Sequence, residues 1–161
     1  MSEHKATVEW KQSGPDFRKG QYSRAHAWRF DGGIEVPASA SPANVAAPWS
    51  DPTAVDPEEA YVASIASCHM LWWLALAAKE GFDVESYRDE AVGEMIPNEA
   101  GVPWVSAVVL HPHIRYGARA AAPADEARLH ELAHARCFIA NSIKTQVSVG
   151  SGKRQAVSGK R

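Results

Sequence analysis

The sequence predicts an α+β fold, in which clustered β-strands are interrupted by two helices. Three observations support this. Short segments of alternating apolar and polar residues crowd the first 40 residues. A stretch of 19 residues without Asp, Glu, Lys or Arg follows at 60–78. A second helical pattern comes late, at 124–137, so strands and helices do not alternate as in a doubly wound parallel sheet. The predicted order is β-β-β-α-β-β-α-β.

The first three strands are predicted from alternation and from the turns between them. The segments "ATVEWKQ", "QYSRAHAWRF" and "IEVPAS" alternate, and "GPDFRKG" and "DGG" separate them as turns. Together they predict a small antiparallel N-terminal unit. The next segment, 39–57, carries four prolines and no usable period, so it is predicted to be a long loop. Long loops in compact domains are often functional.

A long helix is predicted from Pro57 to Glu80 by signals at both of its ends. Asp56 is a suitable N-cap, Pro57 suits the first helical position, and a carboxylate follows at the third. At the other end, Lys79 complements the helix dipole and Gly81 suits the position after the C-cap. These are the ends of a helix in a soluble protein.

The length of this apolar helix also raises the question of a membrane span, which needs about 20 apolar residues. The stretch is rich in Ala and Ser, and it contains His69. With the capping signals, these features favour a core helix and no membrane association. A helix that is apolar on every side must be covered on every side. One small sheet is too little cover, so we expect a homodimer.

The second half of the chain is predicted to hold two strands, a helix and a last strand. Segments 82–96 and 104–116 are each predicted as one strand, joined by the turn "PNEAGVP". A helix starting near Ala124 runs to Cys137, and "FIANSIKTQVSV" continues through a short helical turn into the last strand. No internal repeat is present.

Length and composition bound the organisation and the class of partner. A chain of 161 residues predicts one domain, 1–149, followed by a flexible basic tail rich in Gly and Ser, 150–161. The net charge of −2 argues against nucleic acid as a partner. Two cysteines are too few for a disulfide-stapled secreted scaffold, and the N-terminal residues lack the apolar run of a signal peptide. We therefore expect a cytoplasmic protein.

His130, Glu131 and His134 fit the pattern H-E-x-x-H, in which two histidines on one helix face bind zinc in metalloproteases. A catalytic zinc site also needs a third protein ligand. No Asp or Glu follows Glu131, and Ala140 stands where a third histidine is expected. A zinc protease is therefore disfavoured. A metal site built from His130, His134 and Cys137, which share one helix face, remains a remote alternative.

The two cysteines, Cys68 and Cys137, are either inert buried residues or reactive thiols. Small residues surround Cys68 in "ASIASCHM" and leave room at its sulfur. An apolar helix raises the pKa of a thiol, so a reactive thiolate needs a cation from elsewhere. The candidates are Arg18, Arg24 and Arg29 in the N-terminal hairpin.

A buried arginine needs a carboxylate to hold it. Glu58, at the start of the same helix as Cys68, is well placed for this, and Glu59 is an alternative. The plainer interpretation of Glu58 is that it stabilises the helix N-terminus through the helix dipole.

Three segments carry a resemblance to a known family. The segment "DPEEAYVASIASCHMLWWLALAAKEGF" resembles the central helix of the OsmC/Ohr family, which are small thiol-dependent peroxidases that act on organic hydroperoxides. The segment "AHARCFIANSIKTQV" resembles the second-cysteine segment of that family, and "YSRAHAWRFDGG" resembles its N-terminal hairpin. The resemblance covers about residues 5 to 149 and implies an OsmC-like fold with antiparallel sheets around the central helix, in an intertwined homodimer.

The resemblance also implies an activity and the residues for it. Cys68 would be the peroxidatic cysteine and Cys137 the resolving one, linked in a disulfide during turnover. Glu58 matches the glutamate that orients a catalytic arginine; Arg24 is the preferred match for that arginine, and Arg18 is the alternative. The implied partners are an organic hydroperoxide and an external dithiol reductant, either a lipoylated protein or a thioredoxin-like one. No cofactor is implied.

The chain departs from the family pattern beside both cysteines. Phe138 follows Cys137 where many members have proline, and His69 follows Cys68 where the best-known peroxidases have phenylalanine. Apolar lining for an organic peroxide is expected from Trp72 and Trp73, with Trp49 of the long loop as a further candidate, and these tryptophans are equally suited to core packing. The alternative function is a non-catalytic OsmC-like dimer that binds a hydrophobic ligand.

Overall fold

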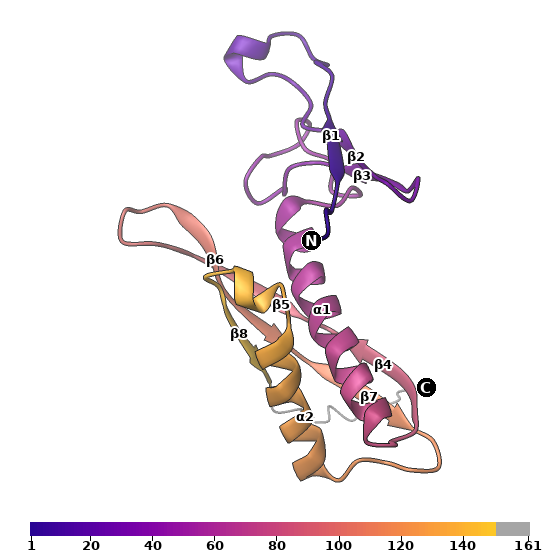
Figure 1. Ribbon diagram of the computed structural model, residues 1–161. Helices are drawn as coiled ribbons and strands as arrows, with labels where there is room; N and C mark the ends of the chain where they lie inside the picture. Colours follow the sequence, from indigo (N-terminus) through magenta and orange to yellow (C-terminus); the bar gives the residue numbers. More distant parts are fainter. Residues whose placement is uncertain (151–161) are drawn as a thin grey trace, which may run out of the picture. The chain divides into compact units, whose positions relative to one another are not determined.

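The computed structural model describes residues 1–150. Most of the predicted tail, from residue 151 on, lies outside the described residues. In chain order the elements are β1 (Ala6–Glu9), η1 (Phe17–Lys19), β2 (His26–Phe30), β3 (Glu35–Ala38), α1 (Pro57–Lys79), β4 (Val84–Asp89), β5 (Val92–Pro97), β6 (Pro103–Leu110), β7 (Pro112–Tyr116), α2 (Pro123–Arg136), η2 (Ala140–Ser142) and β8 (Gln146–Val149). The fold is α+β, as predicted (Figure 1). Contacts divide the chain into two compact units, Met1–Tyr61 and Val62 onward.

The first unit contains the predicted antiparallel N-terminal sheet, with strand order β1-β2-β3. Ala6 pairs with Phe30, and His26 pairs with Ala38. The predicted turn between β2 and β3 is closed by a 3.0 Å hydrogen bond from Phe30 N to the Ile34 carbonyl, and Gly33 adopts φ +84° there. Only glycine enters that left-handed region without strain, so the "DGG" signal is accounted for.

The second unit holds a two-stranded sheet, β4-β7, and a three-stranded sheet, β5-β6-β8. Each of the two long strands predicted from the sequence is broken into two. The break between β4 and β5 lies opposite the break between β6 and β7, because β4 pairs with β7 and β5 pairs with β6. There Asp89 Oδ1 accepts a 2.7 Å hydrogen bond from His111 N, so a side chain replaces the ladder bond. Pro112, opposite Asp89, has no N–H with which to continue the ladder.

One strand departs from the predicted antiparallel sheets. Strand β8 pairs with β6 in the parallel direction, with Ala107 opposite Gln146 and Leu110 opposite Val149. Parallel neighbours need a crossover connection, which is usually a helix. Helix α2 lies on the chain between β6 and β8 and provides that crossover.

Helix α1 begins and ends as its local signals predict. The Asp56 carboxylate accepts from Glu59 N at 2.8 Å, and the Glu59 carboxylate accepts from Asp56 N at 3.2 Å, which is a capping box. After the last turn, Gly81 has φ +78° and Phe82 N donates to the Ala77 carbonyl at 3.0 Å. This closes the helix by the αL route that glycine allows.

The core of the second unit lies where α1 and α2 run side by side over the β4-β7 sheet (Figure 1). Trp73, Leu76 and Ala77 of α1 meet Leu129 and Ala133 of α2, and all five are buried.

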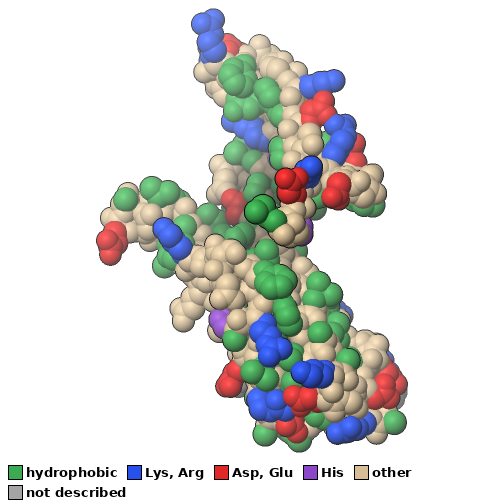
Figure 2. All heavy atoms as spheres, in the orientation of Figure 1, with side chains coloured by type: hydrophobic (Ala, Val, Ile, Leu, Met, Phe, Trp, Pro, Cys, Tyr) green, Lys and Arg blue, Asp and Glu red, His purple; other side chains and the backbone are tan. Residues whose placement is uncertain are grey.

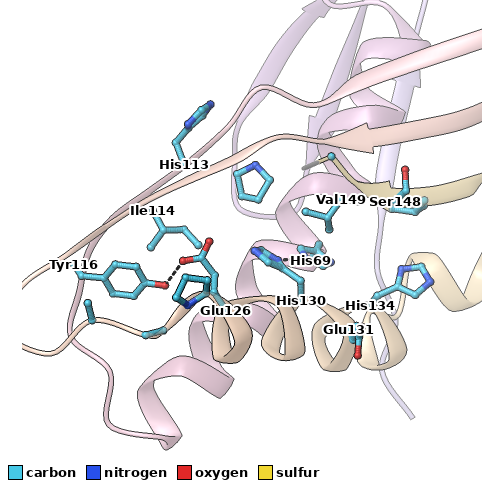
Figure 3. Close-up of a pocket in the computed structure, with 17 residues that line it drawn as sticks. His69, His113, Ile114, Tyr116, Glu126, His130, Glu131, His134, Ser148 and Val149 are labelled. Atoms are coloured by element: carbon cyan, nitrogen blue, oxygen red, sulfur yellow. Dashed lines mark hydrogen bonds between the residues drawn. The ribbon is translucent and has the colours of Figure 1, made fainter. Parts of the chain in front are cut away.

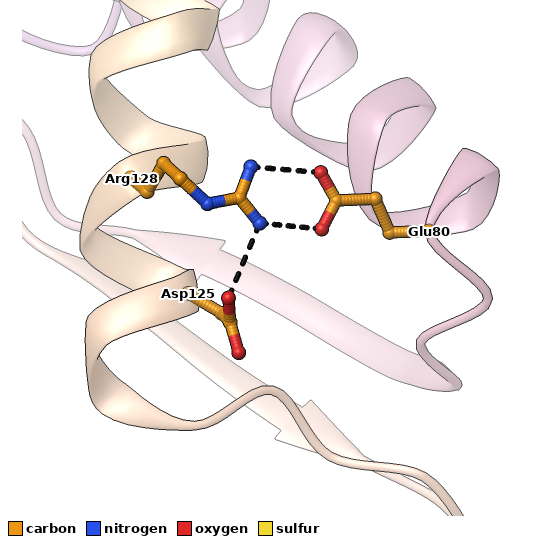
Figure 4. Close-up of polar contacts among 3 residues, drawn as sticks. All are labelled: Glu80, Asp125 and Arg128. Atoms are coloured by element: carbon orange, nitrogen blue, oxygen red, sulfur yellow. Dashed lines mark hydrogen bonds and ion pairs between the residues drawn. The ribbon is translucent and has the colours of Figure 1, made fainter.

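An ion pair joins the first half of α2 to the residue that follows α1. The Arg128 guanidinium donates two hydrogen bonds to the Glu80 carboxylate, at 2.9 and 2.5 Å, and a third to Asp125 at 3.2 Å (Figure 4). A bidentate pair fixes the geometry of two side chains better than a single contact does. The register of α1 against α2 is thus defined at its solvent-facing end as well as in the core.

Helix α1 is buried along one stripe only within the single chain. Its buried residues are Ile65, His69, Trp73, Leu76 and Ala77, which recur at helical spacing. By length and composition alone, this one helix of the described residues could cross a membrane, and 28% of its apolar window is buried. The core-helix prediction therefore accounts for one face of α1.

Other apolar side chains of the second unit also face solvent. They include Leu71 on α1, at 63% exposure, and Val92, Met95 and Ile96 on β5. Hydrophobic side chains are visible on the arm that β5 and β6 form (Figure 2). Exposed apolar patches of this kind mark interaction surfaces in soluble proteins.

Candidate active site

The two cysteines of the chain meet between α1 and α2. The Cys137 thiol donates to the Cys68 sulfur across 2.7 Å, and both cysteines are free. This separation is only about 0.7 Å longer than the S–S bond of a disulfide. The two sulfurs, 69 positions apart in the sequence, are therefore placed where a disulfide forms with little movement.

The end of α2 fixes the position of Cys137. Cys137 leaves the helix with an extended backbone, φ −65° and ψ 115°. Its carbonyl accepts hydrogen bonds from Asn141 N at 3.0 Å and from Asn141 Nδ2 at 2.9 Å. The turn that follows the helix is thus tied to Cys137, and Ala140 N points at its sulfur across 3.4 Å.

The two sulfurs differ in environment. Cys137 is 1% exposed, whereas Cys68 is half-buried. Burial, and next the hydrogen bond that its thiol makes to Cys68, raise the pKa of Cys137 to about 11. Cys137 is therefore a protonated thiol at neutral pH. Cys68 is the more accessible sulfur and the acceptor in the pair, which are the properties that an attacking group requires.

The wall beside the thiols is aromatic. Trp72, one helical turn beyond Cys68, meets Phe138 edge to face at 5.5 Å between ring centroids. Phe138 is 70% exposed and follows Cys137 directly. Trp73 lies in the core at 0% exposure, so core packing was the correct one of its two sequence interpretations. The structure adds Arg136, which lies 5.9 Å from the Trp72 ring.

The predicted arginine–glutamate pair is not formed in the first unit. Glu58 accepts a 3.1 Å hydrogen bond from Asn44, and Glu59 belongs to the capping box. The Arg24 guanidinium donates to two backbone carbonyls, Gly20 at 2.8 Å and Tyr22 at 2.6 Å, and stacks on the Tyr22 ring at 3.7 Å.

The other two candidate arginines also lack a contact with Glu58. Arg29 is bound by the carboxylates of Glu9 and Glu35. Arg18 is exposed in η1 and makes no hydrogen bond or ion pair with the described residues. Which arginine serves Cys68 stays a prediction.

The two histidines of the H-E-x-x-H stretch lie in different environments. His130 is buried, and its Nδ1 lies 2.9 Å from Nε2 of His69, whereas His134 is exposed. The His69 and His130 rings stack at 5.2 Å, with an angle of 10° between planes. No group of three or more His, Cys, Asp or Glu side chains among residues 1–150 is arranged to hold a metal ion. The hypothetical site of His130, His134 and Cys137 is thus not assembled.

Acidification is expected to destabilise the fold through His69. Burial, and next the nearby His130 and His134, lower the pKa of His69 from 6.5 to about 4. Because the unfolded chain binds this proton more tightly, stability is lost as the pH falls from about 6.5 towards 4. The loss is on the order of 3 kcal/mol. Chemical denaturation at pH 7 and pH 4.5 measures it.

Other groups also titrate in this window, so the contribution of His69 is read as a difference between proteins. The variant His69→Phe should lose less stability on acidification than the wild type, and His4→Gln, which changes an exposed histidine near the N-terminus, should behave as the wild type. If the free energy of unfolding falls equally in the wild type and in His69→Phe, protonation of His69 does not destabilise the fold.

The structure also brings together residues that no sequence signal marked. The Tyr116 hydroxyl donates a 2.7 Å hydrogen bond to the Glu126 carboxylate, between β7 and α2. Their separation of ten positions spans a loop and fits no helix or strand period, so no pattern in the sequence could have paired them.

Comparison with known proteins identifies the fold. The sequence matches the family described as OsmC-like protein over residues 50–151. An OsmC-like protein of unknown function from Vibrio cholerae is 47% identical, with a TM-score of 0.88, over 93% of this chain and 99% of that one. A comparison with curated proteins finds no match.

More distant structures share the fold alone. An OsmC organic hydroperoxide resistance protein from Legionella pneumophila is 17% identical, with a TM-score of 0.67, over 93% of this chain and 98% of that one. An organic hydroperoxide resistance protein from Elizabethkingia anophelis is 16% identical, with a TM-score of 0.68, over 94% of this chain and 98% of that one. The family match, the 47% identity and the shared fold establish that this chain belongs to the OsmC family.

Proposed function

We propose that this protein is a thiol-dependent peroxidase that reduces organic hydroperoxides to alcohols in defence against oxidative stress. The observation that carries the proposal is the 2.7 Å approach of Cys68 and Cys137, one sulfur half-buried and the other buried. Two further observations support it. The family includes organic hydroperoxide resistance proteins of the same fold. The aromatic wall of Trp72 and Phe138 suits an apolar peroxide.

The reaction proceeds in three steps. The Cys68 thiolate attacks the outer oxygen of the hydroperoxide; the O–O bond breaks, the alkoxide takes a proton and leaves as the alcohol, and Cys68 becomes a sulfenic acid. The Cys137 sulfur then attacks the Cys68 sulfur, and the sulfenic hydroxyl leaves as water with the Cys137 proton. An external dithiol returns both cysteines to thiols by exchange and is itself oxidised to a disulfide.

The buried thiol of Cys137 suits the second step. Its raised pKa keeps it protonated and unreactive towards peroxide until Cys68 is oxidised. Once Cys68 carries the sulfenic hydroxyl, the two sulfurs are already adjacent. An arginine is proposed to stabilise the Cys68 thiolate, and Glu58 is proposed to orient that arginine. Arg24 is the preferred candidate and Arg18 is the alternative.

The proposed assembly and partners follow from the exposed surfaces and from the chemistry. A second copy of the chain would cover the apolar residues of α1 and β5 that face solvent in one chain. The reductant is proposed to be a lipoylated or thioredoxin-like protein in the cytoplasm. Neither nucleic acid nor a membrane is required.

Mass spectrometry of the peroxide-treated protein tests the proposal. One equivalent of cumene hydroperoxide should remove two hydrogens from the protein and yield a cross-linked peptide that joins Cys68 to Cys137. A dithiol should restore the original mass. Hydrogen peroxide at the same concentration serves as the comparison for substrate preference, and we expect it to react more slowly.

The same experiment separates the peroxidase from the binding-module alternative. If the protein only holds a hydrophobic ligand, both thiols remain titratable after peroxide is added. In that case the peroxidase proposal fails.

A further inference from the structure

A pocket of about 1100 Å³ lies in the second unit, apart from the thiols (Figure 3). One face of α2, strand β7 and the end of β8 form its walls, and His69 of α1 contributes as well. Neither Cys68 nor Cys137 lines it. Its volume is that of a site for a small organic molecule.

The wall of the pocket carries two hydrogen-bonded pairs. His69 Nε2 and His130 Nδ1 are 2.9 Å apart, and the Tyr116 hydroxyl donates to Glu126 Oε2 at 2.7 Å. In Figure 3 the His130 ring lies between His69 on one side and the Glu126 carboxylate on the other. All four side chains line the pocket, and the two hydrogen bonds leave His130 Nε2 and Glu126 Oε1 without a partner among the described residues.

A polar atom of His69 is also unsatisfied in the described structure. His69 is 1% exposed, and its Nδ1 has no hydrogen-bond partner among the described residues. Two neutral imidazoles share one proton across their hydrogen bond. With no partner at His69 Nδ1 to fix the tautomer, His130 Nε2 can be a donor or an acceptor. The pair can therefore adapt to what enters the pocket.

The charge of the lining selects the ligand. Two carboxylates, Glu126 and Glu131, line the pocket, and no Lys or Arg does. Burial lowers the pKa of both His69 and His130, which keeps their rings neutral at pH 7. The remaining lining is mostly apolar, with Ile114, Val147 and Val149, and it also holds His113, His134 and Ser148. The site is rich in acceptors, negative, and set in an apolar cavity.

We propose that this pocket is a binding site for an organic cation, a primary ammonium group on an apolar arm. The ammonium donates to Glu126 Oε1, since Oε2 already accepts from Tyr116, and to His130 Nε2 in the tautomer whose Nδ1–H is donated to His69. The arm lies against the apolar walls. The site is separate from the proposed peroxidase chemistry and does not depend on it.

Calorimetric titration of the full chain at pH 7 tests the charge preference with hexylamine, hexan-1-ol and hexanoate, which share one apolar arm. Hexylamine should bind, and the alcohol and the carboxylate should bind at least about tenfold more weakly, because a charge-assisted pair to a carboxylate is lost. If hexanoate or hexan-1-ol binds as tightly as hexylamine, or if hexylamine does not bind, the proposal is overturned.

A matched pair of variants tests the place of binding. Glu126→Gln keeps the shape of the side chain and removes its charge, and hexylamine should bind it at least about tenfold more weakly. Glu94→Gln changes a carboxylate on β5 that does not line the pocket, and it should bind as the wild type does. Equal affinity in Glu126→Gln and wild type would overturn the assignment.

A measurement on the wild-type protein guards against a variant that folds poorly. Hexylamine should shift the imidazole proton resonances of His130 in a saturable manner and leave those of His4, in the first unit, unchanged. If the resonances of His130 do not move at saturating amine, the pocket is not the site.

Discussion

Replacing Cys68 with serine is expected to abolish peroxide reduction. A serine hydroxyl is not ionised at neutral pH and does not form the sulfenic acid on which turnover depends. Loss of a nucleophile that forms a covalent intermediate costs at least about 10³-fold in rate. Consumption of cumene hydroperoxide, with excess dithiol present, measures the loss.

The matched control is Cys137→Ser, which leaves Cys68 in place. This variant should reduce about one equivalent of peroxide and then stall, because no second thiol is adjacent to the sulfenic acid. With more peroxide, Cys68 should proceed to sulfinic acid, seen as a mass gain of two oxygens. Turnover at the wild-type rate in Cys68→Ser would show that the chemistry lies elsewhere in the chain.

Replacing Trp73 with alanine is expected to lower the free energy of unfolding by about 3–5 kcal/mol. Trp73 is fully buried at the centre of the core cluster, and its ring lies 5.5 Å from His130, 5.7 Å from Tyr87 and 6.4 Å from Tyr116. Removing the indole leaves a cavity that helices on one side and strands on the other cannot close. Denaturant unfolding followed by circular dichroism, at a fixed protein concentration, measures the change.

The control for Trp73 is a charged residue on the same helix. Lys79 is exposed, so Lys79→Arg should change the free energy of unfolding by no more than about 0.5 kcal/mol. A cost below about 1 kcal/mol for Trp73→Ala would mean that the core is centred elsewhere.

Features of the fold that depend on local sequence could be predicted. The ends of α1 are set by Asp56, Pro57 and Glu59 at one end and by Gly81 at the other, all within a few residues of the helix. The turn at Gly33 is equally local. In each case the residues that determine the conformation lie beside it in the chain, so a reading of the sequence finds them.

Features that depend on distant residues could not be predicted. The break in the two long strands rests on the contact of Asp89 with His111, which are 22 positions apart. Pro112 is a local sign of one of the breaks, but nothing in the sequence shows that the Asp89 carboxylate accepts from His111 N across the sheet. His69 and His130 are 61 positions apart, and only the packing of α1 on α2 shows that they meet.

The candidate site was predicted in part. Resemblance named Cys68 and Cys137, and the structure brings their sulfurs together. The H-E-x-x-H pattern singled out His130 as a possible zinc ligand. In the structure His130 lies within hydrogen-bond distance of His69, whereas His134 is exposed, so the two do not form a metal site. A spacing motif records which residues share a helix face, and it does not record what packs against that face.

The place of the two cysteines has a consequence for the stability of the whole second unit. A covalent bond between Cys68 and Cys137 would tie α1 to the end of α2 across a loop of about 70 residues, which restricts the unfolded chain by about 4 kcal/mol. The oxidised protein would then melt at a higher temperature than the reduced one. The melting temperature would therefore report the fraction of the protein that peroxide has oxidised and that the reductant has not yet restored.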